Sequence, residues 1–277
     1  MRNSSSSWVA RVSRALVPAL LVASSIVGLA PTARADGRQF VLAEDARSPG
    51  AVEGIYTLNV GVSGAGALRF VDPVVAREGV VQRAGAQVSL TPWLALGAFG
   101  LAEVAGASGA GVRTAGGGYV SLSVLRPRAE DGGEALDGLS LGVQVWASRE
   151  LEGGFSLSTW LNAGYQRRAL SLAGNLQLEK RFAVLADPLD VIVRLGVSVE
   201  VARSGDDGLR LGLEYVGQDL EDLIEHEDVE GGALHLIAPA LTAVLADRRL
   251  SVGVAPGLVA GARGVGFGGR LMIAYAF

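Results

Sequence analysis

Large apolar residues recur at every second position from about residue 53 to the end of this chain. The last run, GVGFGGRLMIAYAF, shows the pattern best. One of its faces carries Val265, Phe267, Leu271, Ile273, Tyr275 and Phe277. The other carries Gly266, Gly268, Arg270, Met272, Ala274 and Ala276. A period of two places alternate side chains on opposite faces of a β-strand. The sequence therefore predicts strands with one large apolar face and one face of small or charged residues.

The small-residue face distinguishes between two kinds of β-protein. In a soluble β-sandwich, the face turned away from the core is broadly polar. Here that face is glycine and alanine with an occasional charge, in a chain with 39 Gly, 49% hydrophobic and 19% charged residues. Apolar-out, polar-in alternation is typical of a transmembrane barrel, so we predict an all-β fold, an antiparallel transmembrane β-barrel. A helical membrane bundle is disfavoured, because no apolar run of about 20 residues follows the N-terminus.

The alternating runs number about 12, and an even number suits a single-chain barrel. They span 54–63, 79–90, 93–103, 112–125, 139–147, 155–165, 168–179, 189–201, 208–217, 232–244, 249–260 and 265–277. Tight connections follow the second, sixth and tenth runs, at Pro92, Gln166–Arg167 and Asp247. Longer connections follow the first, seventh and ninth, which predicts short turns at one end and longer loops at the other. The connection over 126–138 departs from this rule and leaves the count or the orientation open there.

The N-terminus has the pattern of an export signal. Arginines precede the apolar stretch ALVPALLVASSIVGLA, and Ala33 and Ala35 have the spacing of a cleavage site. A retained membrane anchor is the alternative, disfavoured because Pro18 and two serines interrupt the stretch. The predicted domains are a signal peptide over 1–35, a short N-terminal segment over 36–53 and the barrel over 54–277.

Charge and cysteine content restrict the possible partners and chemistry. Cleavage would remove four arginines and no acid, and would take the formal charge from −4 to −8. So acidic a chain argues against a nucleic-acid partner. The chain has no Cys, which excludes a thiolate nucleophile, a zinc–thiolate site and a lipid-modified cysteine.

The last strand carries a resemblance to a known superfamily. RLMIAYAF resembles the C-terminal signature of bacterial outer-membrane β-barrel proteins, in which the last strand ends in Phe after alternating apolar residues. The resemblance implies a location in the Gram-negative outer membrane, reached through the periplasm, with membrane lipid as a partner. It also implies recognition by the barrel-assembly machinery, through Phe277, Tyr275, Ile273 and Leu271. It indicates no particular solute.

The aromatic residues suit a barrel whose short turns face the periplasm and whose longer loops face outward. Those expected near the periplasmic interface are Tyr56, Trp93, Tyr165, Tyr275 and Phe277. Those expected near the other interface are Phe155, Tyr215 and Phe267. Two aromatic girdles are typical of transmembrane barrels, and the alternative is that the aromatic residues are simply scattered.

Charges within the strands fall on the small-residue face. They are Arg83, Arg194, Glu200, Arg210, Glu214 and Arg270. An arginine that faced lipid at the bilayer centre would cost about 2–4 kcal/mol, so these six are expected to face the lumen. Arginines outnumber carboxylates in this set, which favours anions in an open passage. The alternative is that the six side chains pair with one another and fill the barrel.

Catalytic and metal-binding motifs are not recognisable. The two histidines, His226 and His235, form no pattern resembling an outer-membrane phospholipase or protease, and we expect neither an enzyme nor a cofactor. The acidic segment 218–231 around His226 has enough oxygen ligands for a hard cation. It lacks the order of a defined calcium loop, so we expect a solvated loop and no metal site. Glycine-rich 104–118 lacks a Gly-Lys-Ser motif and is interpreted as loop and strand.

These patterns together predict an integral outer-membrane β-barrel that acts as a passive channel for small polar or anionic solutes. The first alternative is a closed structural or adhesive barrel without transport. The second is a secreted, soluble β-sandwich, which would have two sheets without closure.

Overall fold

The computed structural model describes the strands and tight turns of the predicted barrel region. The described residues are 50–62, 79–105, 112–125, 128–129, 136–150, 154–182, 189–218, 220, 233–246, 249–261 and 264–277. The predicted signal peptide and most of the segment over 36–53 lie outside this part of the chain. No helix in the described residues is long and apolar enough to cross a membrane.

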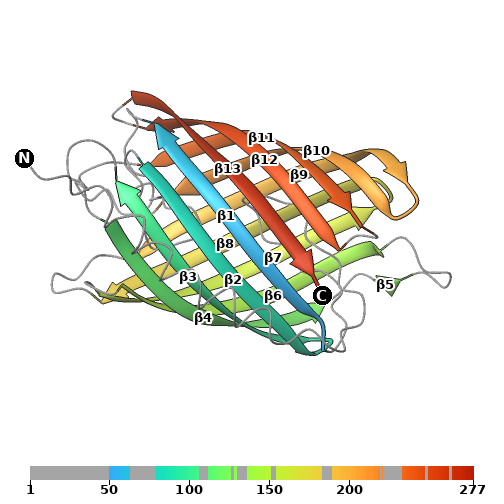
Figure 1. Cartoon of the computed structure of the whole chain (residues 1–277), viewed down its shortest axis with the longest axis horizontal. Coiled ribbons are helices and arrows are strands. Elements are labelled where there is room, and N and C mark those ends of the chain that lie inside the picture. Colours follow the sequence, from blue (N-terminus) through green and yellow to red (C-terminus); the bar gives the residue numbers. More distant parts are fainter. Residues whose placement is uncertain are drawn as a thin grey trace, which may run out of the picture.

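The described chain consists of twelve long strands and one very short one (Figure 1). The strands are β1 (Val52–Val62), β2 (Gly79–Thr91), β3 (Leu94–Ala105), β4 (Val112–Leu125), β5 (Arg128–Ala129), β6 (Leu136–Glu150), β7 (Phe155–Arg167), β8 (Leu170–Phe182), β9 (Asp190–Ser204), β10 (Asp207–Gln218), β11 (Leu234–Leu245), β12 (Leu250–Gly261) and β13 (Gly264–Ala276).

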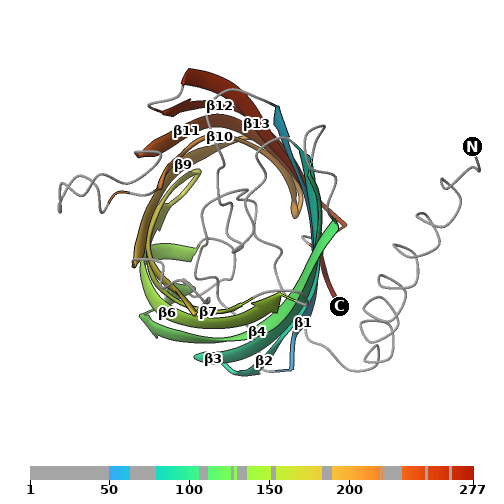
Figure 2. The ribbon, with the colours of Figure 1, turned by 90° about the vertical axis from the view of Figure 1, so that its left-hand side faces the viewer.

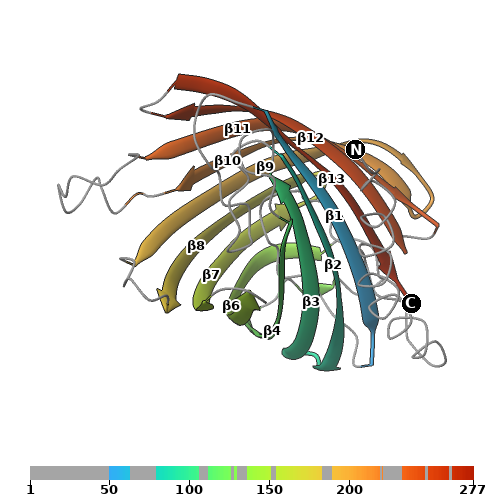
Figure 3. The ribbon, with the colours of Figure 1, turned by 60° about the vertical axis from the view of Figure 1, so that its left-hand side comes forward.

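The long strands form one closed antiparallel sheet. Each pairs with its neighbours in sequence, β1 pairs with β13, and β4 pairs with β6, so no long strand is left at an edge. Figure 2 shows the strands running round the resulting ring, and Figure 3 shows β1, β2 and β3 side by side on one wall. The predicted fold class, a barrel of about 12 antiparallel strands, is confirmed. The single closed sheet excludes the β-sandwich.

The two ends of the barrel differ in their connections. The end that carries Gly50 and Phe277, here called the terminal end, has tight turns between β2 and β3, β7 and β8, β9 and β10, and β11 and β12. The opposite end, the loop end, carries the connections 63–78, 106–111, 183–188 and 219–233. The predicted tight turns lie at the terminal end and the predicted longer connections at the loop end, but the alternation is incomplete, because residues 262–263 join β12 to β13 at the loop end and residues 126–135 join β4 to β6 at the terminal end.

One local prediction was wrong, and the question left open over 126–138 is resolved. The turn after β7 lies at Arg168 and Ala169, two residues later than expected, and Arg168 has a positive φ of 50°. The connection over 126–138 is longer than the alternation of short and long connections predicts. Part of it is strand, because β6 begins at Leu136 and pairs there with β5. The connection is thus partly a short hairpin, and neither the strand count nor the orientation changes.

Exposure alternates along the strands as the sequence pattern predicts. In β8, Leu170 and Leu172 are exposed, whereas Ser171 and Asn175 are buried. In β13, the face with Ile273 and Tyr275 is the more exposed and the face with the glycines and Arg270 is buried. Large apolar side chains therefore cover the outside of the barrel, as a protein surrounded by lipid requires.

Glycine allows close approach at the seam where β4 meets β6. A Cβ at Gly117 would overlap the backbone oxygen of Ala147 and lie 2.9 Å from the Cα of Ser148. We expect Gly117→Val to destabilise the barrel by about 1–3 kcal/mol, because backbone on the facing strand cannot move aside cheaply. Chemical unfolding of the refolded protein measures the change. Gly100→Val on β3 is the control, since nothing lies within 4 Å of its Cβ position. Equal stability of the two variants would contradict close packing at the seam.

Candidate functional site on the inner face

The six charges predicted to face the lumen all lie on the inner face. Arg194, Glu214 and Arg270 are buried, and Arg83, Glu200 and Arg210 are partly buried. Arg270, Arg194, Arg83 and the pair of Glu200 and Arg210 make contacts at four places along the wall.

Arg270 on β13 lies beside a neutral partner. Its Nε donates to Asn59 Oδ1 on β1 at 2.5 Å, and the two residues are directly opposite in the register of β1 and β13. Asn59 is also buried. The contact ties the first and last strands together on the inner side of the barrel.

Arg194 on β9 is the most deeply placed of the six. Its guanidinium lies over the ring of Trp160, 4.1 Å from the centroid, and its Nη1 donates to Gln177 Oε1 at 2.7 Å. Gln177 in turn donates from Nε2 to Glu179 Oε2 at 2.9 Å. Glu179 is directly opposite Asp190 in the register of β8 and β9, and both carboxylates are buried. Arg194 is thus linked to the carboxylate of Glu179 through Gln177.

Arg83 on β2 belongs to an aromatic cluster. Its guanidinium lies 4.7 Å from the ring centroids of both Phe99 and Trp146. Tyr119 stacks on Trp146 at 4.1 Å, and its ring occupies the space where a Cβ at Gly97 would lie. Contacts with aromatic faces help to hold a guanidinium in place. The cluster spans β3, β4 and β6 and reaches Trp160 on β7, whose ring centroid lies 6.1 Å from that of Trp146.

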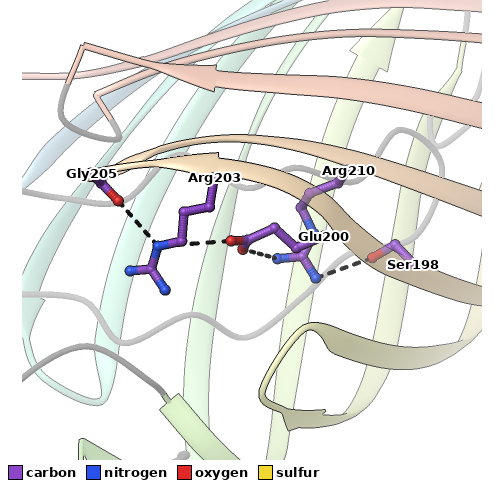
Figure 4. Close-up of polar contacts among 5 residues, drawn as sticks. All are labelled: Ser198, Glu200, Arg203, Gly205 and Arg210. Atoms are coloured by element: carbon purple, nitrogen blue, oxygen red, sulfur yellow. Dashed lines mark hydrogen bonds and ion pairs between the residues drawn. The ribbon is translucent and has the colours of Figure 1, made fainter.

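Glu200, Arg203 and Arg210 form a fourth group near the terminal end (Figure 4). Arg210 Nη1 lies 3.7 Å from Glu200 Oε2, and Arg203 Nε lies 3.8 Å from Glu200 Oε1. Arg210 also donates to Ser198 at 3.4 Å, and Arg203 donates to the carbonyl of Gly205 at 3.1 Å. The predicted availability of Glu200 as a partner for an arginine on the inner face therefore holds for Arg210.

The charges of the inner face are not limited to the six predicted residues. The described inner face also carries the carboxylates of Glu53, Glu103, Glu179 and Asp190, all buried, in addition to Glu200 and Glu214. These four lie close to strand ends, where the alternation of the sequence is interrupted by turns and loops. The parity of Glu179 and Asp190 nevertheless matches that of Gln177 and Arg194 on the same strands, so the alternation did indicate an inward direction for these two. Carboxylates outnumber arginines among the inward side chains that the structure describes.

Neutral polar residues line one part of the inner wall. On β6 to β8 the buried inward residues include Ser140, Gln144, Ser148, Ser156, Ser158, Asn162, Ser171, Asn175 and Gln177. Some bond to one another, as in Ser148 with Ser156 at 2.7 Å and Asn175 Nδ2 donating to Asn162 Oδ1 at 2.9 Å. The wall on β10 to β12 is different, because Val216, Leu236, Ala238, Ala255 and Val259 belong to one apolar cluster there. The interior is thus polar on one side and largely apolar on the other.

The four residues of the C-terminal signature lie on the outer face of β13. Ile273 and Tyr275 are exposed, and Leu271 and Phe277 are half-exposed. The backbone N of Phe277 donates to the carbonyl of Val52 at 2.9 Å, and the ring of Phe277 meets that of Tyr275 edge to face at 4.9 Å. The signature therefore sits where the last strand closes against the first.

The acidic segment lies almost wholly outside the described residues, including His226. Gln218, at its start, is buried on the inner face. His235 lies on the outer face of β11, where its Nδ1 and the hydroxyl of Tyr215 are 2.8 Å apart. Within the described part of the chain, no three His, Asp or Glu residues gather in a way that could hold a metal ion.

Comparison with known proteins shows a likeness of structure without one of sequence. No protein-family model and no curated protein matches the chain. The structure matches the COG4313 outer membrane channel from Pseudomonas putida F1 with a TM-score of 0.50 at 10% identity, over 88% of this chain and 100% of that one. The chain has the fold of an outer-membrane β-barrel. This barrel also matches a KdgM porin, with a TM-score of 0.48 at 11% identity over 81% of this chain and 99% of the porin. The β-domain of the Bordetella autotransporter Brka gives 0.48 at 12% identity, over 82% and 100%.

Proposed function

We propose that the mature chain is exported through the periplasm and acts in the outer membrane as a passive channel for small polar solutes. The observation that supports this is the row of hydroxyl and amide side chains on the inner faces of β6, β7 and β8. Such groups both donate and accept hydrogen bonds, and can replace part of the hydration of a polar solute without fixing its charge. The apolar outer face supports the membrane location.

The inner charges support a passage without strong preference for anions. Carboxylates and arginines occur on the same wall, as in the region of Arg194, Glu179 and Asp190. Selectivity for the sign of a solute needs an excess of one fixed charge along the passage. We therefore propose polar solutes as the substrate class and no longer favour anionic ones.

A closed structural barrel is the second candidate, and one observation favours it. Trp160 and Arg194 are fully buried, which is the expected state of residues that fill a lumen. Twelve strands lie between the small barrels that side chains fill and the large barrels that leave an open channel. Size alone does not decide between the two functions.

Electrical recording from the refolded mature protein in planar bilayers separates these functions. A channel gives stepwise, ohmic conductance in neutral salt, whereas a closed barrel inserts without conductance. Swelling of liposomes in neutral sugars of increasing size would then give the size limit of the passage. Insertion is verified in the same preparation by slower migration after heating, so that absence of current is informative.

Substitution of Arg270 gives opposite results for the two functions. In a channel, Arg270→Ala removes one inward positive charge, and we expect the reversal potential in a salt gradient to shift towards cations. In a closed barrel, it leaves buried Asn59 without its donor, and we expect a loss of stability of about 1–3 kcal/mol and new conductance. Arg249→Gln at the exposed terminal end is the control for charge removal. No change in selectivity, conductance or melting would show that Arg270 does not border the passage.

A further inference from the structure

A cationic and aromatic patch lies on the outside of the barrel at the loop end. It consists of Arg149 on β6, Phe155 on β7, and Lys180 and Phe182 on β8. Arg149, Phe155 and Phe182 are directly opposite one another in the register of the three strands. Lys180 is the next outward-facing residue on β8, two residues before Phe182, and is directly opposite Leu157. The three residues of the first row are exposed, and Lys180 is partly exposed.

The patch is a local departure from an apolar surface. Its two aromatic rings contact each other, with centroids 5.8 Å apart, and the next outward residues on β7 are Leu157, Thr159 and Leu161, of which the two leucines are exposed. Outward-facing residues at the loop ends of the other described strands are apolar or neutral, such as Val60, Leu258 and Phe267. Arg149 and Lys180 are the charged side chains that face outward there among the residues described, and both are cations.

Two cations at the loop end of the outer surface are complementary to the anionic headgroups of a membrane. Arg149, Phe155 and Phe182 form a row at the loop ends of three adjacent strands. The row therefore marks the edge of the apolar surface that lipid chains cover. Aromatic rings favour this interfacial depth. A guanidinium forms paired hydrogen bonds with phosphate oxygens, and an ammonium adds a mobile positive charge. Juxtamembrane cations attract anionic headgroups.

We propose that this patch binds the phosphorylated headgroup of an outer-leaflet glycolipid. Arg149 and Lys180 contact the phosphates, and the pair of phenylalanines packs against the sugar and the first methylenes of the acyl chains. The inference concerns the outer surface and goes beyond the proposed transport of solutes through the interior. It requires the loop end to face outward, as the long connections at that end indicate.

The test measures lipid binding to the delipidated, refolded barrel by native mass spectrometry in detergent. The probes are lipid A, its dephosphorylated form and phosphatidylethanolamine. We expect lipid A to bind more tightly than the other two lipids. The double variant Arg149→Gln with Lys180→Gln should weaken lipid A binding about tenfold or more, because each interfacial cation contributes independently.

The matched control removes two exposed cations from the opposite end, Arg167→Gln with Arg249→Gln. It should leave lipid A binding unchanged. Equal loss in both double variants would show attraction by net charge and overturn a site at the patch. Equal binding of the dephosphorylated lipid, or full competition by millimolar inorganic phosphate, would exclude recognition of a phosphorylated glycolipid. Conductance of the patch variant is recorded in parallel, and its persistence separates this inference from the proposed channel.

Discussion

Deletion of Phe277 is expected to remove most of the folded protein from the outer-membrane fraction. The backbone N of Phe277 donates to the carbonyl of Val52, and its ring packs against Tyr275 at the end of the seam between β13 and β1. Closure of this seam removes the last free strand edges of the barrel. The proposed assembly signal also ends at this residue, so its loss affects both recognition and closure. Fractionation of cells and heat-dependent migration in gels measure the result.

Phe267→Ala is the matched control for this deletion. It removes an outward aromatic ring from the same strand, but at the loop end, where 65% of Phe267 is exposed. We expect this variant to assemble normally. Refolding of both variants into detergent distinguishes the two roles of Phe277, because spontaneous closure needs no assembly machinery. Normal outer-membrane levels of the deletion variant would refute a role for Phe277 in assembly, and recovery of folded, soluble protein from the periplasm would refute the membrane location.

The fold could be predicted from the sequence because the two-residue period of a strand alone shows on which face each side chain lies. In a strand, each residue's direction depends only on its parity, so the leucines of β8 and the valines of β9 could be assigned to the outer face from the sequence alone. Closure followed from the same pattern, since large apolar residues on the outside and small residues within leave no surface for a second sheet. Strand ends were less accurate: β6 extends three residues beyond the predicted range at each end.

The contents of the inner face could not be predicted in the same way. Phe99, Tyr119, Trp146 and Trp160 lie on four different strands, and their contacts depend on the register between strands. Trp146 had the correct parity for the interior, but parity does not show which residues lie beside it. The cross-strand neighbours Glu179 and Asp190 are separated by a loop in sequence, so their proximity is visible only in the register of β8 and β9.

Replacement of Arg194 is expected to give the largest loss of stability among inner-face substitutions. Arg194→Met keeps the length of the side chain but removes a fully buried charge that contacts Trp160 and Gln177. The buried carboxylate of Glu179 would remain, linked through Gln177 to a side chain without charge. Loss of one member of a buried charged group costs about 3–5 kcal/mol. Denaturant unfolding of the refolded barrel measures the change.

A double variant distinguishes loss of charge balance from simple loss of packing. If the carboxylates cause the cost, Arg194→Met with Glu179→Gln should recover a large part of the lost free energy, because the neutral amide needs no cation. If packing on Trp160 causes it, the second substitution should recover nothing. Arg203→Met at the exposed rim is the control and should change stability by less than about 0.5 kcal/mol. Full stability of Arg194→Met would instead mean that water reaches both carboxylates on this wall. That outcome would favour an open passage along β8 and β9 over a filled one.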